Sequence, residues 1–202
     1  MPVIRDEFCE DDVRLCIWHI TETAEELPQP RNVDLSNIRS IARKREILAV
    51  YALLSYMTGR DDLLIEYDER GKPQIQGWYL GISHTKGWAA LILSKRRCVA
   101  VDIEYKSDRV AKVVPRFMRP DEKTDNLLCQ LVSWSAKETV YKLLSAENLQ
   151  YYEMRLKPFE PLTKGRLEVE NLKNDGSIVV DYELNEDYVL TYASLDSREG
   201  LC

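Results

Sequence analysis

Apolar residues recur at helical spacing in the first part of the chain, after a polar stretch that contains Pro28 and Pro30. A period of three to four residues is typical of an amphipathic helix, and a glycine often follows its end. The sequence therefore predicts one long helix that ends near Gly59. The apolar positions that define it are Leu35, Ile38, Ile41, Ala42, Leu48, Tyr51 and Ala52.

Short runs rich in β-forming residues follow this helix, and polar or glycine-containing turns separate them. The runs occupy residues 63–67, 79–83, 88–94 and 98–105, and the first turn covers 68–73. This pattern predicts an antiparallel meander.

A second helical region and a second group of strands complete the chain. Helical spacing begins near Arg109, is interrupted by prolines, and resumes strongly over residues 127–146. Strand-like runs follow at 151–159, 165–170, 177–184 and 188–194, with a tight turn at 174–176. The repeated order predicts an α+β fold of two similar lobes, 1–105 and 106–202, in a pseudo-dimer with the active site in the cleft between them. One continuous α+β domain is the alternative.

Composition indicates a folded protein in solution. The 202 residues are 45% hydrophobic and 31% charged, which is typical of a globular chain. A net charge of -6 argues against general nucleic-acid binding, which needs a dominant positive field. No apolar run approaches the roughly 18 residues of a membrane span, and we expect no signal peptide. The five scattered cysteines form no C-x-x-C pair, so we expect no zinc site or disulfide framework and a reducing, cytoplasmic location.

The run at 98–105 carries two acids, Asp102 and Glu104. Because strand side chains alternate, both carboxylates are expected on one side of the strand, about 7 Å apart. Two oxygen ligands at this spacing can share a hard cation such as Mg²⁺. A solvated strand face is the alternative interpretation.

The helix at 127–146 adds a third acid and two lysines. Trp134, Glu138 and Lys142 follow one another at intervals of four residues, so one helical face should carry all three. The alternative is an ordinary surface Glu–Lys pair beside a core tryptophan.

Three further features suit a phosphate-bearing ligand. Ser83 and His84 end a strand-like run, and an imidazole there could hydrogen-bond a phosphate. Lys72 lies in the turn Gly-Lys-Pro. One side of the long helix is basic, and arginine and lysine both bind phosphate, although such residues often form only a solvated face. These helix residues are Arg39, Arg43, Lys44 and Arg45.

The chain resembles the 4′-phosphopantetheinyl transferase superfamily through four motifs in the family's order. They are Gly-Lys-Pro at 71–73, Ile-Ser-His-Thr at 82–85, Val-Asp-Ile-Glu at 101–104, and Trp-Ser-Ala-Lys-Glu at 134–138 followed by Lys142. The length is similar to that of the two-lobed, single-chain type related to the surfactin synthetase activator. The resemblance runs from about Arg39 to Lys142.

This resemblance implies transfer of the 4′-phosphopantetheine group of coenzyme A to a serine of an apo carrier protein, with release of adenosine 3′,5′-bisphosphate. This is a holo-[acyl-carrier-protein] synthase activity. It implies Mg²⁺ held by Asp102, Glu104 and Glu138, and catalytic roles for Glu138, Lys142 and Lys137. The residues implied to bind coenzyme A, in the first lobe, are Arg39, Arg43, Lys44, Arg45, Lys72, Ser83 and His84. The second lobe would dock the carrier.

Two positions depart from the family pattern. Ala100 replaces a usual glycine, and Glu46 stands where some relatives have a threonine that touches the 3′-phosphate. A carboxylate there would repel an anion unless it pairs with Arg43 or Arg45.

Carrier proteins of this kind are acidic, and one basic stripe could dock them. The stripe consists of Arg109, Lys112, Arg116 and Arg119. We expect a monomer, and Glu122 is a further candidate metal ligand. Two other functions stay open: a non-catalytic module that binds coenzyme A or another nucleotide, and a magnesium-dependent phosphohydrolase that needs no carrier.

Overall fold

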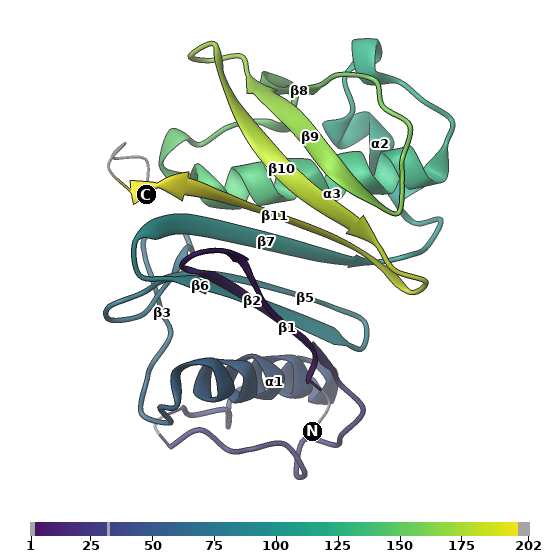
Figure 1. Ribbon diagram of the computed structural model, residues 1–202. Helices are drawn as coiled ribbons and strands as arrows, with labels where there is room; N and C mark the ends of the chain where they lie inside the picture. The colour runs from purple at the N-terminus through teal and green to yellow at the C-terminus, as the bar shows by residue number, and fades with distance from the viewer. Residues whose placement is uncertain (1–2, 32, 198–202) are drawn as a thin grey trace. The chain divides into compact units, whose positions relative to one another are not determined.

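The computed structural model describes residues 3–31 and 33–197, and the chain divides into two compact units, Met1–Val99 and Ala100–Cys202 (Figure 1). Each unit combines helix with antiparallel sheet, so the predicted α+β class is confirmed. The pseudo-dimer of similar lobes, its cleft, and the lobe limits 1–105 and 106–202 stay predictions.

Unit 1 contains a four-stranded sheet in the order β1-β2-β6-β5 and a separate β3-β4 pair. The strands are β1 Val3–Glu10, β2 Val13–His19, β3 Glu66–Tyr67, β4 Pro73–Gln74, β5 Tyr79–Thr85 and β6 Trp88–Ser94. β5 and β6 form the expected antiparallel hairpin. The prediction that all four runs form one antiparallel meander is wrong. The run at 63–67 contributes only the two-residue strand β3. The second neighbour of β6 is β2, which was not predicted from the sequence.

Helix α1, Ile41–Thr58, packs against β2 and β6 and has a defined cap at each end (Figure 1). The Ser40 side chain accepts a hydrogen bond from a backbone amide of the first turn. Gly59 follows the last turn with φ 69°, a left-handed conformation that glycine adopts at little cost. The predicted start was too early, since residues 35–40 precede the helix.

Unit 2 contains most of a five-stranded sheet in the order β7-β11-β10-β9-β8, against which α3 packs (Figure 1). Its strands are β7 Arg97–Tyr105, β8 Met154–Leu156, β9 Lys164–Asn171, β10 Gly176–Leu184 and β11 Tyr188–Asp196. Its helices are α2 Val110–Phe117 and α3 Leu127–Leu143, with short 3₁₀ turns η1 Pro120–Glu122, η2 Ser145–Glu147 and η3 Tyr151–Glu153. α2 continues through Pro115, where the sequence predicted a break.

Helix α3 is buried on nearly every side. Between Cys129 and Val140 only Trp134 and Glu138 are partly exposed, and Lys142 is the next partly exposed residue on the same face. The predicted face that carries these three side chains is therefore confirmed.

No helix within residues 3–31 and 33–197 has the length and apolar character needed to cross a membrane. Cys9, Cys16 and Cys129 are free thiols. Cys98 is disulfide-bonded, which the cysteine spacing did not indicate, and Cys202 lies outside the described residues.

Candidate functional site

Three carboxylates of unit 2, two from β7 and one from α3, interact electrostatically. Asp102 and Glu104 belong to β7, and Glu138 belongs to α3. The β7 residues that alternate with the two acids, Val101 and Ile103, are buried. Burial is the main reason that the pKa values of Glu104 and Glu138 are raised, and the charge of Asp102 raises both further. Both glutamates are therefore harder to ionise here than in water.

Lys142 supplies the positive charge nearest to these acids. Its Nζ donates to Asp102 Oδ1 at 2.6 Å and to the Val101 carbonyl oxygen at 3.1 Å. The lysine also opposes the rise in the pKa of Glu104 and Glu138. One ammonium thus partly offsets three carboxylates.

Each carboxylate also accepts a hydrogen bond from a neutral donor. Trp134 Nε1 donates to Glu104 Oε1 at 2.7 Å, and Ser135 Oγ donates to Asp102 Oδ2 at 2.8 Å. The Tyr151 hydroxyl donates to Glu138 Oε1. These donors restrict how each acid can be oriented.

A buried chain of hydroxyl groups lies behind Asp102. The Thr191 hydroxyl oxygen is 2.9 Å from Ser135 Oγ and 2.7 Å from Thr139 Oγ1. Ser135, Thr139 and Thr191 have no exposed surface. The hydroxyl groups satisfy one another in the interior, and Ser135 fixes one Asp102 oxygen.

The chemistry of this donor set fits a hard cation, because carboxylate oxygens are the ligands that Mg²⁺ prefers and a cation nearby would favour the ionised forms of the two buried glutamates. Within this group, Lys142 Nζ is paired with Asp102 Oδ1. Across residues 3–31 and 33–197, no group of three or more His, Cys, Asp or Glu side chains is gathered closely enough to hold a metal ion. Binding of Mg²⁺ would therefore require these side chains to move.

Lys137 has different surroundings from the acids. Its Nζ is buried and donates to Glu122 Oε2 at 2.6 Å and to the carbonyl oxygens of Phe117 and Tyr151. Burial lowers the pKa of Lys137, whereas the Glu122 carboxylate opposes this effect. Glu122 is thus paired with Lys137 and also accepts from the Leu156 amide. These contacts are those of a structural ion pair, and the catalytic role of Lys137 stays a prediction.

Unit 1 brings together two of the predicted coenzyme A ligands, Arg43 and His84, around Glu46. Glu46 Oε2 is 3.2 Å from Arg43 Nη1 and 3.1 Å from His84 Nδ1, and Arg43 also contacts His84 Nε2. The expected pairing of Glu46 with Arg43 is present, so its carboxylate does not stand alone against an anion. The preceding Ser83 is buried in β5.

The other predicted ligands of unit 1 do not share these contacts. Arg45 turns inward and donates to the Ile20 carbonyl oxygen at 2.9 Å, while Arg39 is exposed before α1 and Lys44 is partly exposed. Lys72 is partly buried in the turn between β3 and β4, and burial lowers its pKa. The predicted basic face is therefore divided among several environments.

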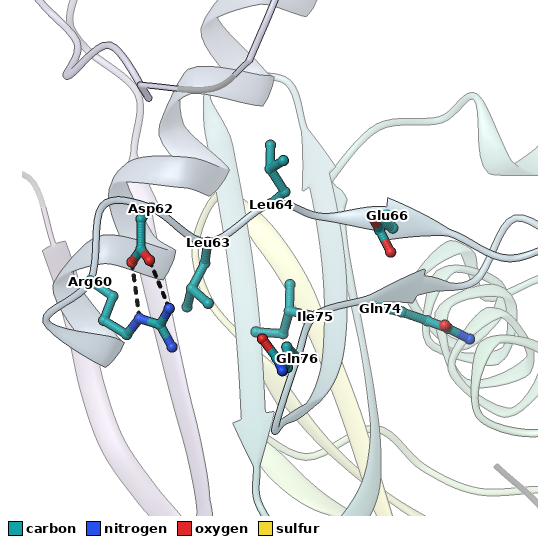
Figure 2. A pocket seen from close by; sticks show the side chains of 8 residues that line it. All are labelled: Arg60, Asp62, Leu63, Leu64, Glu66, Gln74, Ile75 and Gln76. Atoms are coloured by element: carbon teal, nitrogen blue, oxygen red, sulfur yellow. Dashed lines mark hydrogen bonds and ion pairs between the residues drawn. The ribbon is translucent and has the colours of Figure 1, made fainter.

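A separate pocket of unit 1 has a volume of about 550 Å³. Figure 2 shows Arg60 and Asp62 joined by two hydrogen bonds on one side, with Glu66 and Gln74 from β3 and β4 on the other. Its remaining lining residues are Leu63, Leu64, Ile75 and Gln76. None of the residues predicted to act on a ligand lines this pocket.

The segment that contains the acids also matches a known family. Residues 98–193 match the model of the 4′-phosphopantetheinyl transferase superfamily. This match supports phosphopantetheine transfer in general. It includes the predicted metal and catalytic residues, whereas the predicted coenzyme A ligands precede it. No curated protein matches the chain.

Sequence interpretation missed Ser135, Tyr151 and Thr191 as partners of the acids. Ser135 adjoins Trp134, and its helical position relative to β7 could have suggested a contact. Tyr151 and Thr191 are 13 and 56 residues away from the groups they contact, and no spacing rule connects such positions.

Proposed function

We propose that this protein transfers the 4′-phosphopantetheine group of coenzyme A to a serine of an acidic apo carrier protein. The products would be the holo carrier and adenosine 3′,5′-bisphosphate. The observation that carries the proposal is that Asp102, Glu104, Glu138 and Lys142 interact within the segment that matches the transferase superfamily. A magnesium ion is the proposed cofactor.

Asp102, Glu104 and Glu138 are the proposed magnesium ligands. When bound, the ion would supply positive charge to the pyrophosphate oxygens of coenzyme A. Lys142 contacts Asp102, and its ammonium would also be able to bind a phosphate oxygen once a cation shared the charge of that carboxylate.

In the proposed reaction, the serine oxygen forms a bond to the β-phosphorus, and the bond from that phosphorus to the oxygen of the departing bisphosphate breaks. Lys142 offsets the negative charge that grows on the leaving group, an electrostatic effect that often dominates such reactions. We assign Glu138 to cation binding, because a carboxylate bound to a cation is a weak base. The serine proton then passes to water.

The unit 1 residues supply the proposed contacts to the nucleotide. They are Arg39, Arg43, Lys44, Arg45, Lys72, Ser83 and His84. The Arg43 and His84 contacts with Glu46 support a binding role for this region, since both side chains are held beside one another. A monomer of the surfactin-activator type, located in the cytoplasm, is part of the same proposal.

The direct test is carrier-dependent release of adenosine 3′,5′-bisphosphate from coenzyme A, measured by chromatography with Mg²⁺ or EDTA. The proposal expects bisphosphate only when enzyme, Mg²⁺ and apo carrier are all present. Release without a carrier would indicate the phosphohydrolase. Binding of coenzyme A without any product, across several apo carriers, would indicate the binding module instead.

A further inference from the structure

Glu46 contacts two side chains of unit 1 that have the chemistry to bind a phosphate. It belongs to α1, three residues after Arg43, and His84 belongs to β5. Its Oε2 atom lies 3.2 Å from Arg43 Nη1 and 3.1 Å from His84 Nδ1. A single carboxylate oxygen therefore pairs with both residues.

The imidazole of His84 is engaged through both ring nitrogens. Arg43 contacts Nε2, and because a guanidinium can only donate, Nε2 is the acceptor of this contact. In a neutral imidazole the proton is then on Nδ1, the nitrogen that faces Glu46. The hydrogen-bonding groups of the ring are thus used within the set of three side chains.

The charges of these three side chains cancel. Arg43 is positive, Glu46 is negative, and the imidazole in this tautomer is neutral. A phosphate that approaches Arg43 would also approach the Glu46 carboxylate, and two like charges a few Å apart repel each other. An anion can therefore bind Arg43 well only if it displaces Glu46.

Such an exchange is physically accessible, because water reaches all three side chains. The side chains of Arg43, Glu46 and His84 are 45%, 23% and 29% exposed. Ion pairs with this degree of exposure typically contribute no more than about 1 kcal/mol. Arg43 can thus exchange the carboxylate for a phosphate at modest cost, and the bidentate geometry of a guanidinium suits either partner.

We infer that Glu46 is an internal competitor, which pairs with Arg43 and His84 where a ligand phosphate would bind and so limits the affinity of unit 1 for a nucleotide. The identity of that nucleotide, coenzyme A, rests on the function proposed above. The same competition lowers the affinity for a product that keeps the nucleotide phosphates, and it therefore favours product release.

The test compares two substitutions that each remove one negative charge from unit 1. Glu46→Gln removes the charge but keeps the length of the side chain and an oxygen that can accept from Arg43. Glu25→Gln is the matched control, because it removes an exposed carboxylate of the same unit and leaves the Glu46 contacts in place. Folding of both variants is checked by circular dichroism and urea unfolding.

The first measurement is coenzyme A binding by isothermal titration calorimetry, without a carrier and with EDTA so that no metal ion binds the phosphates. We expect Glu46→Gln to bind about fivefold more tightly than the native protein or better, since a like charge about 4 Å from an anion costs about 1 kcal/mol in water. Glu25→Gln should bind as the native protein does. In about 1 M NaCl the gain should largely disappear, because salt screens the repulsion.

Weaker binding by Glu46→Gln would overturn the inference, because it would show that the carboxylate holds Arg43 and His84 in place for the ligand. Equal affinity of all three proteins, an equal gain in both variants, or a gain that persists at high salt would also overturn it. So would the absence of coenzyme A binding by both the native protein and Glu46→Gln.

The second measurement is transfer to an apo carrier at varied coenzyme A. We expect Glu46→Gln to lower the KM for coenzyme A without raising kcat, and a raised KM would contradict the inference. If the native protein binds coenzyme A but modifies no carrier, the proposed function fails, and the binding affinities alone decide the role of Glu46.

Discussion

Two ion pairs on α3 have the same separation but lie in different surroundings. Lys137 Nζ is 2.6 Å from Glu122, and the two side chains are 0% and 4% exposed. Lys142 Nζ is also 2.6 Å from Asp102, but the lysine side chain is 31% exposed and the acid 5%. Lys137 has two further carbonyl acceptors, whereas Lys142 has one.

This difference separates a structural lysine from one that a substrate can reach. A charge with no exposed surface must keep its partner, because water cannot replace it. A lysine with a third of its side chain exposed can exchange one anionic partner for another at much lower cost. Sequence position alone does not distinguish them, since both belong to the same motif-bearing segment.

The largest effect is expected for Lys137→Gln. This change leaves the Glu122 carboxylate buried without its cation and should lower the free energy of unfolding by about 3–5 kcal/mol. Urea denaturation at pH 7 measures it. An unchanged urea denaturation midpoint would show that this ion pair has no structural role.

The same substitution at Lys142 should affect activity more than stability. We expect Lys142→Gln to lower the rate of carrier modification by about 10²- to 10³-fold, because it removes a charge near the leaving group. Stability should fall by less than for Lys137→Gln, because Asp102 is as buried as Glu122 but the position that Lys142 vacates is partly open to water. A large loss of stability with full activity would instead make Lys142 a structural lysine and contradict its proposed role at the leaving group.

An ion pair of unit 1 with about a quarter of each side chain exposed should give a smaller, pH-dependent effect. Arg14 holds Asp6 at 2.8 Å, and its hydrogen bonds keep the pKa of Asp6 below the ordinary value of 3.8. The folded state therefore binds fewer protons than the unfolded state at low pH, so this stabilisation is present above pH 4 and is lost as the pH falls further.

We accordingly expect Asp6→Asn to lower the free energy of unfolding by about 1 kcal/mol at pH 7. The difference from the native protein should shrink below pH 4, as measured by urea unfolding across a pH series. A difference that grows on acidification would contradict the assignment.

The smallest effect is expected for the exposed pair of Arg60 and Asp62, whose side chains are both about half exposed. Arg60→Gln should leave the unfolding midpoint unchanged within error, because surface ion pairs contribute little. A loss of unfolding free energy as large as that expected for Lys137→Gln would show that exposure does not determine how much each ion pair stabilises the fold.

Much of the acidic site could be predicted from local geometry. Strand alternation placed Asp102 and Glu104 on one side of β7, and helical spacing placed Trp134, Glu138 and Lys142 on one face of α3. The structure confirms both through the hydrogen bonds that join β7 to α3. These regularities depend only on short-range backbone periodicity.

The remaining features depend on packing between distant segments. Burial of Lys137 follows from η1 and η3 enclosing its ammonium, and the Tyr151 contact follows from the turn of the chain after α3. Strand β1 was not predicted because most of its residues are exposed, so its sequence shows no alternation of apolar and polar positions. The alternation in β2 was weak, because residues on both of its faces are buried.

The proposed transfer can be measured as the intact mass of an apo carrier protein incubated with this protein, coenzyme A and Mg²⁺. We expect a mass gain equal to one phosphopantetheine group, absent with EDTA and absent when the acceptor serine of the carrier is replaced by alanine. An unchanged mass across several apo carriers, under conditions where coenzyme A and Mg²⁺ both bind, would contradict it.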